Sequence, residues 1–120
     1  MGNPVMWFEM LVDDPDKAND FYEELFDWKI NRSNPKNYGF VNTGAKKGIH
    51  GGIGQPGETG ENKMLIYVEV DDLSTYMNKA VKLGAKVILP PQEIDGFPIA
   101  IFEDPEGHKV GIIKNKQKNK

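Results

Sequence analysis

The chain has 120 residues, a formal net charge of −3 and no cysteine. This length suits one compact domain, and the lack of cysteine excludes disulfides, thiol catalysis and Cys-ligated metal centres. It also favours a cytoplasmic location. No apolar run approaches the roughly 20 residues of a membrane-spanning helix, so no membrane partner is expected.

The charge is unevenly distributed along the chain. Four lysines lie in residues 114–120, so residues 1–113 carry a net charge of −7. An acidic body argues against a nucleic-acid groove, because phosphate contacts need clustered basic side chains. The basic end is polar enough to be disordered, and we interpret it as a solubilising tail.

The first half is expected to begin with a strand over residues 5–12, whose only charged residue before the closing aspartates is Glu9. Asp14 followed by Pro15 is typical of a helix N-cap and first helical position. The helix is expected to bury a stripe spaced i, i+3, i+4, i+7, namely Ala18, Phe21, Tyr22 and Leu25. Further strands are expected over residues 28–30, 38–43 and 49–53.

The second half repeats this pattern 58 positions later, with six identities between residues 6–30 and residues 64–88. Asp72 is the expected N-cap of the second helix, and Gly84 suits its left-handed C-terminal end. Strands over 97–103 and 109–113 flank Asp-Pro-Glu-Gly at 104–107, which fits a type I turn. Each half therefore reads βαβββ, with residues 54–63 as a flexible link.

Several local motifs strengthen this interpretation: V-D-D-P-D-K-A-N-D-F-Y (12–22), Y-V-E-V-D-D-L (67–73), L-G-A-K-V (83–87) and F-E-D-P-E-G-H-K-V-G (102–111). Together they resemble the vicinal oxygen chelate superfamily of glyoxalase I, bleomycin-resistance proteins, fosfomycin-resistance enzymes and extradiol dioxygenases. The resemblance implies an α+β fold in which two tandem βαβββ modules, about 1–58 and 62–113, form one domain (1–113). It further implies a curled eight-stranded mixed sheet around a cleft, helices outside, and a homodimer.

Metal-dependent members of that superfamily carry His, Glu or Gln ligands at positions that correspond here to Trp7, Leu65 and Gly111. None of these side chains binds a divalent cation. One further donor, His50, is too few for a catalytic zinc or iron, which needs about three protein ligands. The resemblance thus implies a protein without metal or other cofactor; an unorthodox site from Glu9, His50 and Glu69 is the alternative.

Strand alternation assigns the residues that face the expected cleft. It directs Trp7, Glu9 and Leu11 of the first strand away from the helix, and Leu65, Tyr67 and Glu69 likewise in the second module. The apolar alternates should pack under the helices, namely Met6, Phe8, Met10 and Val12 in the first strand and Met64, Ile66, Val68 and Val70 in the second. The candidate ligand-binding residues are Trp7, Glu9, His50, Leu65, Tyr67, Phe102 and Lys109.

Glu9 is the most informative candidate, because a carboxylate within an apolar strand is costly to bury unless it is paired. It could anchor a cationic or hydroxylated ligand, or act as a general base. It could equally lie at a solvated cleft edge, or be satisfied by Tyr67 or a backbone amide. Trp7 could stack on a flat ligand or simply fill the space of a lost metal.

These observations favour a metal-free small-molecule-binding protein with an apolar and aromatic cleft and one buried carboxylate. The alternative is a glyoxalase-like lyase or isomerase, or a dioxygenase-related enzyme, with Glu9 and Tyr67 as candidate catalytic residues. A dimeric interaction module, its cleft filled by Trp7, Leu65 and Phe102, is the third hypothesis. Whether the protein is an enzyme stays open at this point.

Overall fold

The computed structural model describes residues 2–56 and 63–114. The chain forms two compact units, one of Trp7–Leu65 and the other of Met1–Met6 with Ile66–Lys120. The first residues of the chain belong to the second unit because they run beside its first strand. There the amide of Glu69 donates to the carbonyl of Pro4 at 2.9 Å, and the side-chain amide of Asn3 donates to the Glu69 carbonyl at 3.0 Å.

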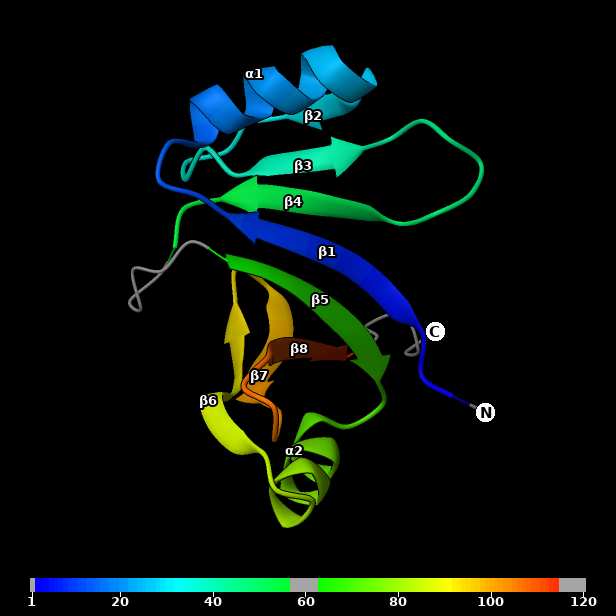
Figure 1. Cartoon of the computed structure of the whole chain (residues 1–120), viewed down its shortest axis with the longest axis vertical. Helices are drawn as coiled ribbons and strands as arrows, with labels where there is room; N and C mark the ends of the chain where they lie inside the picture. Colours follow the sequence, from blue (N-terminus) through cyan, green and yellow to red (C-terminus); the bar gives the residue numbers. More distant parts are fainter. Residues whose placement is uncertain (1, 57–62, 115–120) are drawn as a thin grey trace. The chain divides into compact units, whose positions relative to one another are not determined.

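The first unit holds β1 (Val5–Leu11) from Trp7 onward, α1 (Pro15–Phe26), β2 (Lys29–Asn31), β3 (Gly39–Asn42) and β4 (His50–Gly54). Its strands lie in the order β2-β3-β4-β1 (Figure 1). β1 and β4 are parallel, whereas the β2–β3 and β3–β4 pairs are antiparallel. α1 packs against β2 and β4.

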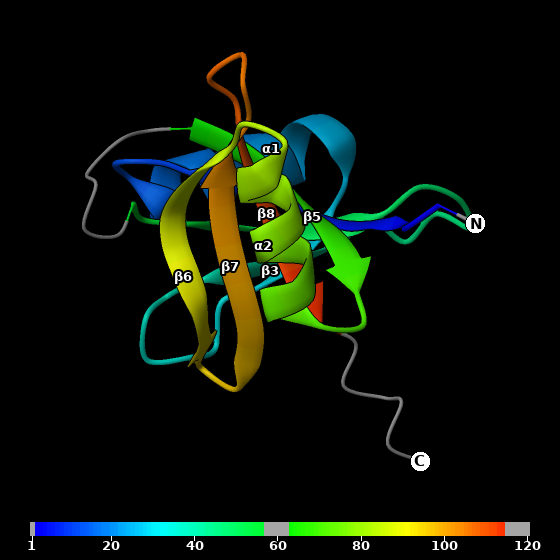
Figure 2. The same ribbon diagram turned by 90° about the horizontal axis from the view of Figure 1, so that it is seen from below.

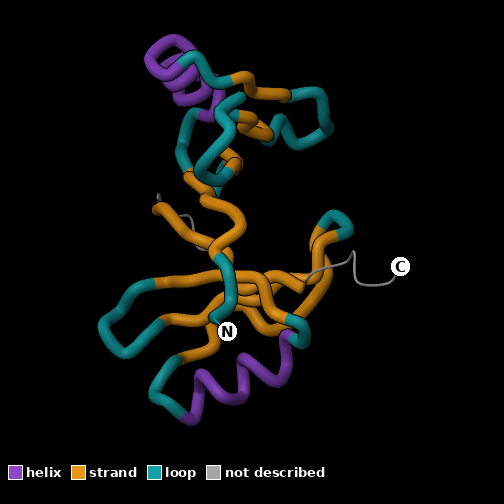
Figure 3. Tube along the Cα trace, turned by 90° about the vertical axis from the view of Figure 1, so that its right-hand side faces the viewer, coloured by secondary structure: helices purple, strands orange, loops and turns teal. Residues whose placement is uncertain are grey.

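The second unit repeats this topology with β5 (Lys63–Val70), α2 (Leu73–Lys82), β6 (Lys86–Ile94), β7 (Phe97–Glu103) and β8 (Lys109–Lys114). The strand order is β5-β8-β7-β6, with β5 and β8 parallel and the other pairs antiparallel. α2 packs against β6, β7 and β8 (Figure 2). Figure 3 shows one helix beside each group of strands.

The described residues thus form eight strands and two helices, and the expected α+β fold with two βαβββ modules is confirmed. A cleft shared by the modules stays a prediction. No helix within residues 2–56 and 63–114 is long and apolar enough to span a membrane.

The predicted helix ends and turn are confirmed by their hydrogen bonds. The Asp14 carboxylate accepts from the amide of Lys17 at 3.2 Å, and that of Asp72 from the amide of Thr75 at 2.9 Å. Gly84 has a φ of +108°, which only glycine adopts without strain. The amide of Gly107 donates to the Asp104 carbonyl at 2.9 Å and closes the predicted turn.

Three residues at the ends of the predicted link and tail belong to strands instead. Gly54 and Lys63 fall in the predicted link but belong to β4 and β5, and Gly54 pairs with Leu11 of β1. Lys114 was assigned to the tail but ends β8, opposite Val70 of β5. The rest of the predicted tail and most of the link, residues 115–120 and 57–62, lie outside the described residues.

The predicted buried stripe of α1 is wrong for two of its residues. Phe21 and Leu25 are each 56% exposed, whereas Pro15 and Asn19 are buried. The helix is turned because Trp28, just before β2, stacks on Tyr22 with ring centres 5.6 Å apart and also contacts Phe26 and Phe8. The face of α1 that contacts the sheet is therefore rotated about the helix axis, by about one residue, from the predicted apolar stripe.

Asn19 is the polar residue in this helix–sheet contact. It is fully buried, and neither its side-chain nitrogen nor its oxygen has a hydrogen-bond partner within the described residues. It packs directly on Gly39 of β3, where an added Cβ atom would lie only 2.5 Å from the Asn19 oxygen. Glycine at this position therefore lets α1 approach the sheet closely.

In the second unit the core lies between α2 and the sheet. Its buried members are Val70, Leu73, Met77, Ala100 and Ile112, with Val68, Tyr76 and Phe102 packed against them. The prediction that Val68 and Val70 face the helix is confirmed. It is wrong for Met64 and Ile66, expected on the same face, which are 68% and 41% exposed.

Candidate functional site

A chain of three hydrogen-bonded side chains crosses one face of the first unit's sheet. The indole nitrogen of Trp7 donates to the hydroxyl oxygen of Tyr38 at 3.3 Å, and that hydroxyl donates to a carboxylate oxygen of Glu9 at 2.8 Å. Trp7 and Glu9 are two residues apart on β1, so their side chains leave the same face, as predicted. This face is opposite the one on which Phe8 contacts Trp28, which in turn packs on Tyr22 of α1.

Tyr38 reaches Glu9 because two glycines of β4 leave room for its ring. Gly52 lies opposite Glu9 in the β1–β4 register, and a Cβ atom added there would overlap the Tyr38 hydroxyl. A Cβ atom added at Gly54 would lie 2.6 Å from the same ring. Asn34 orients Tyr38 from the preceding loop, accepting from its amide at 2.9 Å and donating to its carbonyl at 2.7 Å.

Tyr38 is not among the site residues predicted from the sequence. The predicted partners of Glu9 are Tyr67 or a backbone amide, whereas the structure provides a tyrosine from the segment that leads into β3. A signal was present in the alternating glycines 52 and 54. A strand face without side chains needs a large residue from elsewhere to cover it, but the sequence does not say which residue that is.

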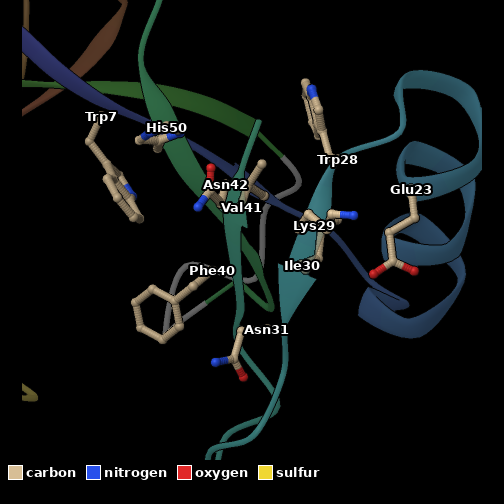
Figure 4. Close-up of a pocket in the computed structure, with 10 residues that line it drawn as sticks. All are labelled: Trp7, Glu23, Trp28, Lys29, Ile30, Asn31, Phe40, Val41, Asn42 and His50. Carbon is tan, nitrogen blue, oxygen red and sulfur yellow. The ribbon is translucent and has the colours of Figure 1, made fainter. Parts of the chain in front are cut away.

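An open groove of about 620 Å³ begins beside Trp7 and extends to the edge strand β2 (Figure 4). Trp7 and Phe40 form one wall, with their ring centres 6.3 Å apart in an edge-to-face arrangement, and Phe40 also contacts Tyr38 at 4.9 Å. The other lining residues are Glu23, Trp28, Lys29, Ile30, Asn31, Val41, Asn42 and His50. Aromatic walls with a few polar groups are the usual composition of a small-molecule site.

His50 is directly opposite Trp7 in the β1–β4 register and lines this groove. Its Nδ1 accepts a hydrogen bond from the amide of Thr43 at 3.2 Å. The neutral imidazole therefore carries its proton on Nε2, which makes that nitrogen a donor. His50 is exposed, as expected for a residue that contacts a ligand or solvent.

The acidic residue of the groove, Glu23, belongs to an ion-pair cluster. Arg32 donates to Asp20 at 2.9 Å and to Glu23 at 3.2 Å, and it lies 3.6 Å from Asp16. The hydrogen bond to Asp20 is the main cause that raises the pKa of Arg32 above its ordinary value. These contacts join the end of β2 to α1 and hold the Glu23 wall of the groove in place.

The second unit shows a related arrangement at Tyr67. This residue pairs with Gly111 of β8 as Glu9 pairs with Gly52 of β4, and its side chain is only 5% exposed. A Cβ atom added at Gly111 would overlap the Tyr67 ring. In both units, a tyrosine ring covers the glycine that faces the middle of the first strand.

The three positions predicted to have lost metal ligands do not fit a metal. Trp7 uses its nitrogen to donate to Tyr38, Leu65 is 3% exposed, and Gly111 lies under Tyr67. Within residues 2–56 and 63–114, no group of three His, Asp or Glu side chains is arranged to hold a metal ion. The set Glu9, His50 and Glu69 draws on both units and stays a prediction.

The remaining candidates have different surroundings. The prediction that Phe102 faces the cleft is wrong: it packs with Ala100 on the α2 side, because both residues project from the same face of β7. Lys109 does share a strand face with Gly111, and its ammonium group lies 3.5 Å from Glu103, the residue opposite it on β7.

The fold is that of a known class of proteins. A family model described as the Glyoxalase/Bleomycin resistance protein/Dioxygenase superfamily matches residues 5–112, and the chain belongs to this superfamily. A curated protein of Mycobacterium bovis, named "Putative glyoxylase CFP32", is 30% identical over 115 residues. The alignment covers 92% of this chain and 43% of the relative, so the chain spans less than half of that protein's length.

Solved structures agree on the fold. A superfamily member from Vibrio splendidus has a TM-score of 0.67 at 12% identity, over 95% of this chain and all of its own. A structure described as an NAD-dependent benzaldehyde dehydrogenase from Legionella pneumophila has a TM-score of 0.71 at 21% identity, over 92% of this chain and 98% of its own. At these identities, the likeness shows the fold alone.

Proposed function

We propose that this protein binds a small molecule, without a metal, in the groove beside Trp7. The observation that carries this proposal is the hydrogen-bonded chain Trp7–Tyr38–Glu9 next to the aromatic wall of Trp7 and Phe40. The wall suits a flat apolar body. Glu9 and Tyr38 do not line the groove themselves, so a cationic or hydroxyl group on the ligand would have to reach the carboxylate past Trp7. The ligand class is therefore an aromatic compound that carries an amine or a hydroxyl.

A second candidate function is proton-transfer catalysis of the lyase or isomerase type. It is favoured by the 2.8 Å hydrogen bond between Tyr38 and Glu9, which pairs a carboxylate base with a phenol that can relay its proton. The glyoxylase name of the mycobacterial relative supports this alternative. Here Tyr38 takes the role that the sequence analysis assigned to Tyr67, whose side chain is almost fully buried.

The metal-free part of the proposal is tested by melting temperature. Untagged protein is measured with a chelator and then with added Ni, Zn, Mn, Fe(II) or Mg, alongside elemental analysis of the untreated sample. We expect no shift and no stoichiometric metal, because the predicted ligand positions hold an indole, a buried leucine and a covered glycine. A stoichiometric metal that raises the melting temperature by mass action would contradict the proposal.

The ligand site is tested with Glu9→Gln after a screen of aromatic amines and phenols. Glutamine keeps an acceptor for the Tyr38 hydroxyl, so the melting temperature should change by no more than a few degrees. Binding of an aromatic amine should weaken by about tenfold, the effect of losing one charge-assisted hydrogen bond.

Glu24→Gln, an exposed carboxylate on α1 outside the groove, is the matched control and should bind normally. If Glu9→Gln melts much lower yet binds every hit as tightly as the original protein, Glu9 has a structural role and is no ligand anchor.

A further inference from the structure

The second unit contains an apolar groove that is separate from the site described above. It has a volume of about 260 Å³ and lies between one side of α2 and the sheet strands β5, β7 and β8. Its floor consists of Val68, Val70, Phe102, Val110 and Ile112. All of these side chains are apolar, so the floor offers no hydrogen bond to a ligand.

The wall formed by α2 brings one positive charge to this groove. Four residues of one helix face, spaced i, i+3, i+4 and i+7, line the groove: Tyr76, Lys79, Ala80 and Leu83. Lys79 is exposed at the rim, and its ammonium group forms no ion pair with any residue of the described ranges. Asn3 lines the groove as well, but its amide is engaged with the Glu69 carbonyl.

We infer that this groove binds a small carboxylate with an apolar body, such as a medium-chain or aryl-alkyl acid. An apolar cavity of about 150 Å³ is enough to hold benzene, so 260 Å³ accommodates a short alkyl chain or a ring with a short substituent. The apolar body would lie on Phe102 and the valines, and the carboxylate would pair with Lys79. Charge complementarity selects the acid over neutral molecules of the same shape.

Octanoate and its neutral analogue octanol are the probes for this inference. Titration of the isotopically labelled chain should show saturable shifts in the amides of Val68, Ala80 and Phe102. Lys79→Gln should weaken octanoate binding about three- to fivefold, the contribution of a partly exposed ion pair, and leave octanol unchanged. Lys82→Gln, a lysine on the same helix that does not line the groove, is the matched control and should bind both probes normally.

A second variant tests the cavity itself. Ala80→Leu places a larger side chain in the groove and should abolish binding of both probes. If that variant fails to fold, Lys79→Glu replaces it and should weaken octanoate binding further than Lys79→Gln does.

Three results would overturn the inference. The first is equal binding of octanoate by the original chain and Lys79→Gln. The second is the absence of saturable shifts at the groove. The third is sedimentation showing a dimer that Ala80→Leu dissociates, because a second copy of the chain would then cover this surface.

Discussion

Gly52→Ala is expected to destabilise the protein by at least about 3 kcal/mol, at the upper end of what overpacking costs. The new methyl group would overlap the hydroxyl of Tyr38, and Asn34 holds the backbone of Tyr38 by hydrogen bonds to its amide and carbonyl. Moving the tyrosine ring away from β4 would strain its hydrogen bond to Glu9. Urea denaturation with linear extrapolation measures the loss.

If a clash with Tyr38 causes this loss of stability, removing the Tyr38 side chain should relieve it. In a Tyr38→Ala background the methyl group has room, so Gly52→Ala should then cost less than about 1 kcal/mol. Gly2→Ala is the control for a general glycine effect, because a Cβ atom there meets nothing within 4 Å. An equal loss at position 52 with and without Tyr38 would show that β4 needs glycine for a reason other than the tyrosine.

Gly111→Ala should have an effect of similar size in the second unit, about 2 to 3 kcal/mol. Here the obstacle is the ring of Tyr67, a side chain only 5% exposed. The measurement is a double-mutant cycle with Tyr67→Ala. Because both changes act on one space, the double variant should lose less stability than the two single losses together, by 1 kcal/mol or more.

This result bears on the chemistry of the superfamily as well as on stability. The family resemblance implies that position 111 matches a metal-ligand position of metal-dependent members, and a histidine placed there would need the volume that Tyr67 occupies. Additive losses in the cycle would mean that Tyr67 moves aside readily, and the position could then accept a ligand side chain. Strong coupling would show that the tyrosine closes this position to metal chemistry.

The local elements were predictable because short-range signals determine them. Each of these signals satisfies backbone groups within a few residues, and the structure shows the hydrogen bonds. They are the N-caps Asp14 and Asp72 and the Asp-Pro-Glu-Gly turn. The 58-residue repeat then indicated that the same topology occurs twice. Strand alternation correctly directed Trp7 and Glu9 away from α1.

The prediction was wrong where side chains distant in sequence compete for one space. Phe21 and Leu25 follow the helical period, yet Trp28 on the next segment turns α1 so that Asn19 faces the sheet instead. Phe102 and Ile101 are equally apolar, so composition alone could not choose which of them faces α2. Packing against Leu73 and Met77 decides it.

The amino-acid sequence by itself determined the superfamily, the order of the elements and the absence of ligand side chains at positions 7, 65 and 111. Only the tertiary structure revealed Tyr38 as the partner of Glu9, 29 residues away in the chain, and Tyr67 as the cover of Gly111. Capping, turns and alternation depend on neighbours in sequence. A ring that lies over a glycine depends on which strands meet, and that pairing arises only when the sheet has formed.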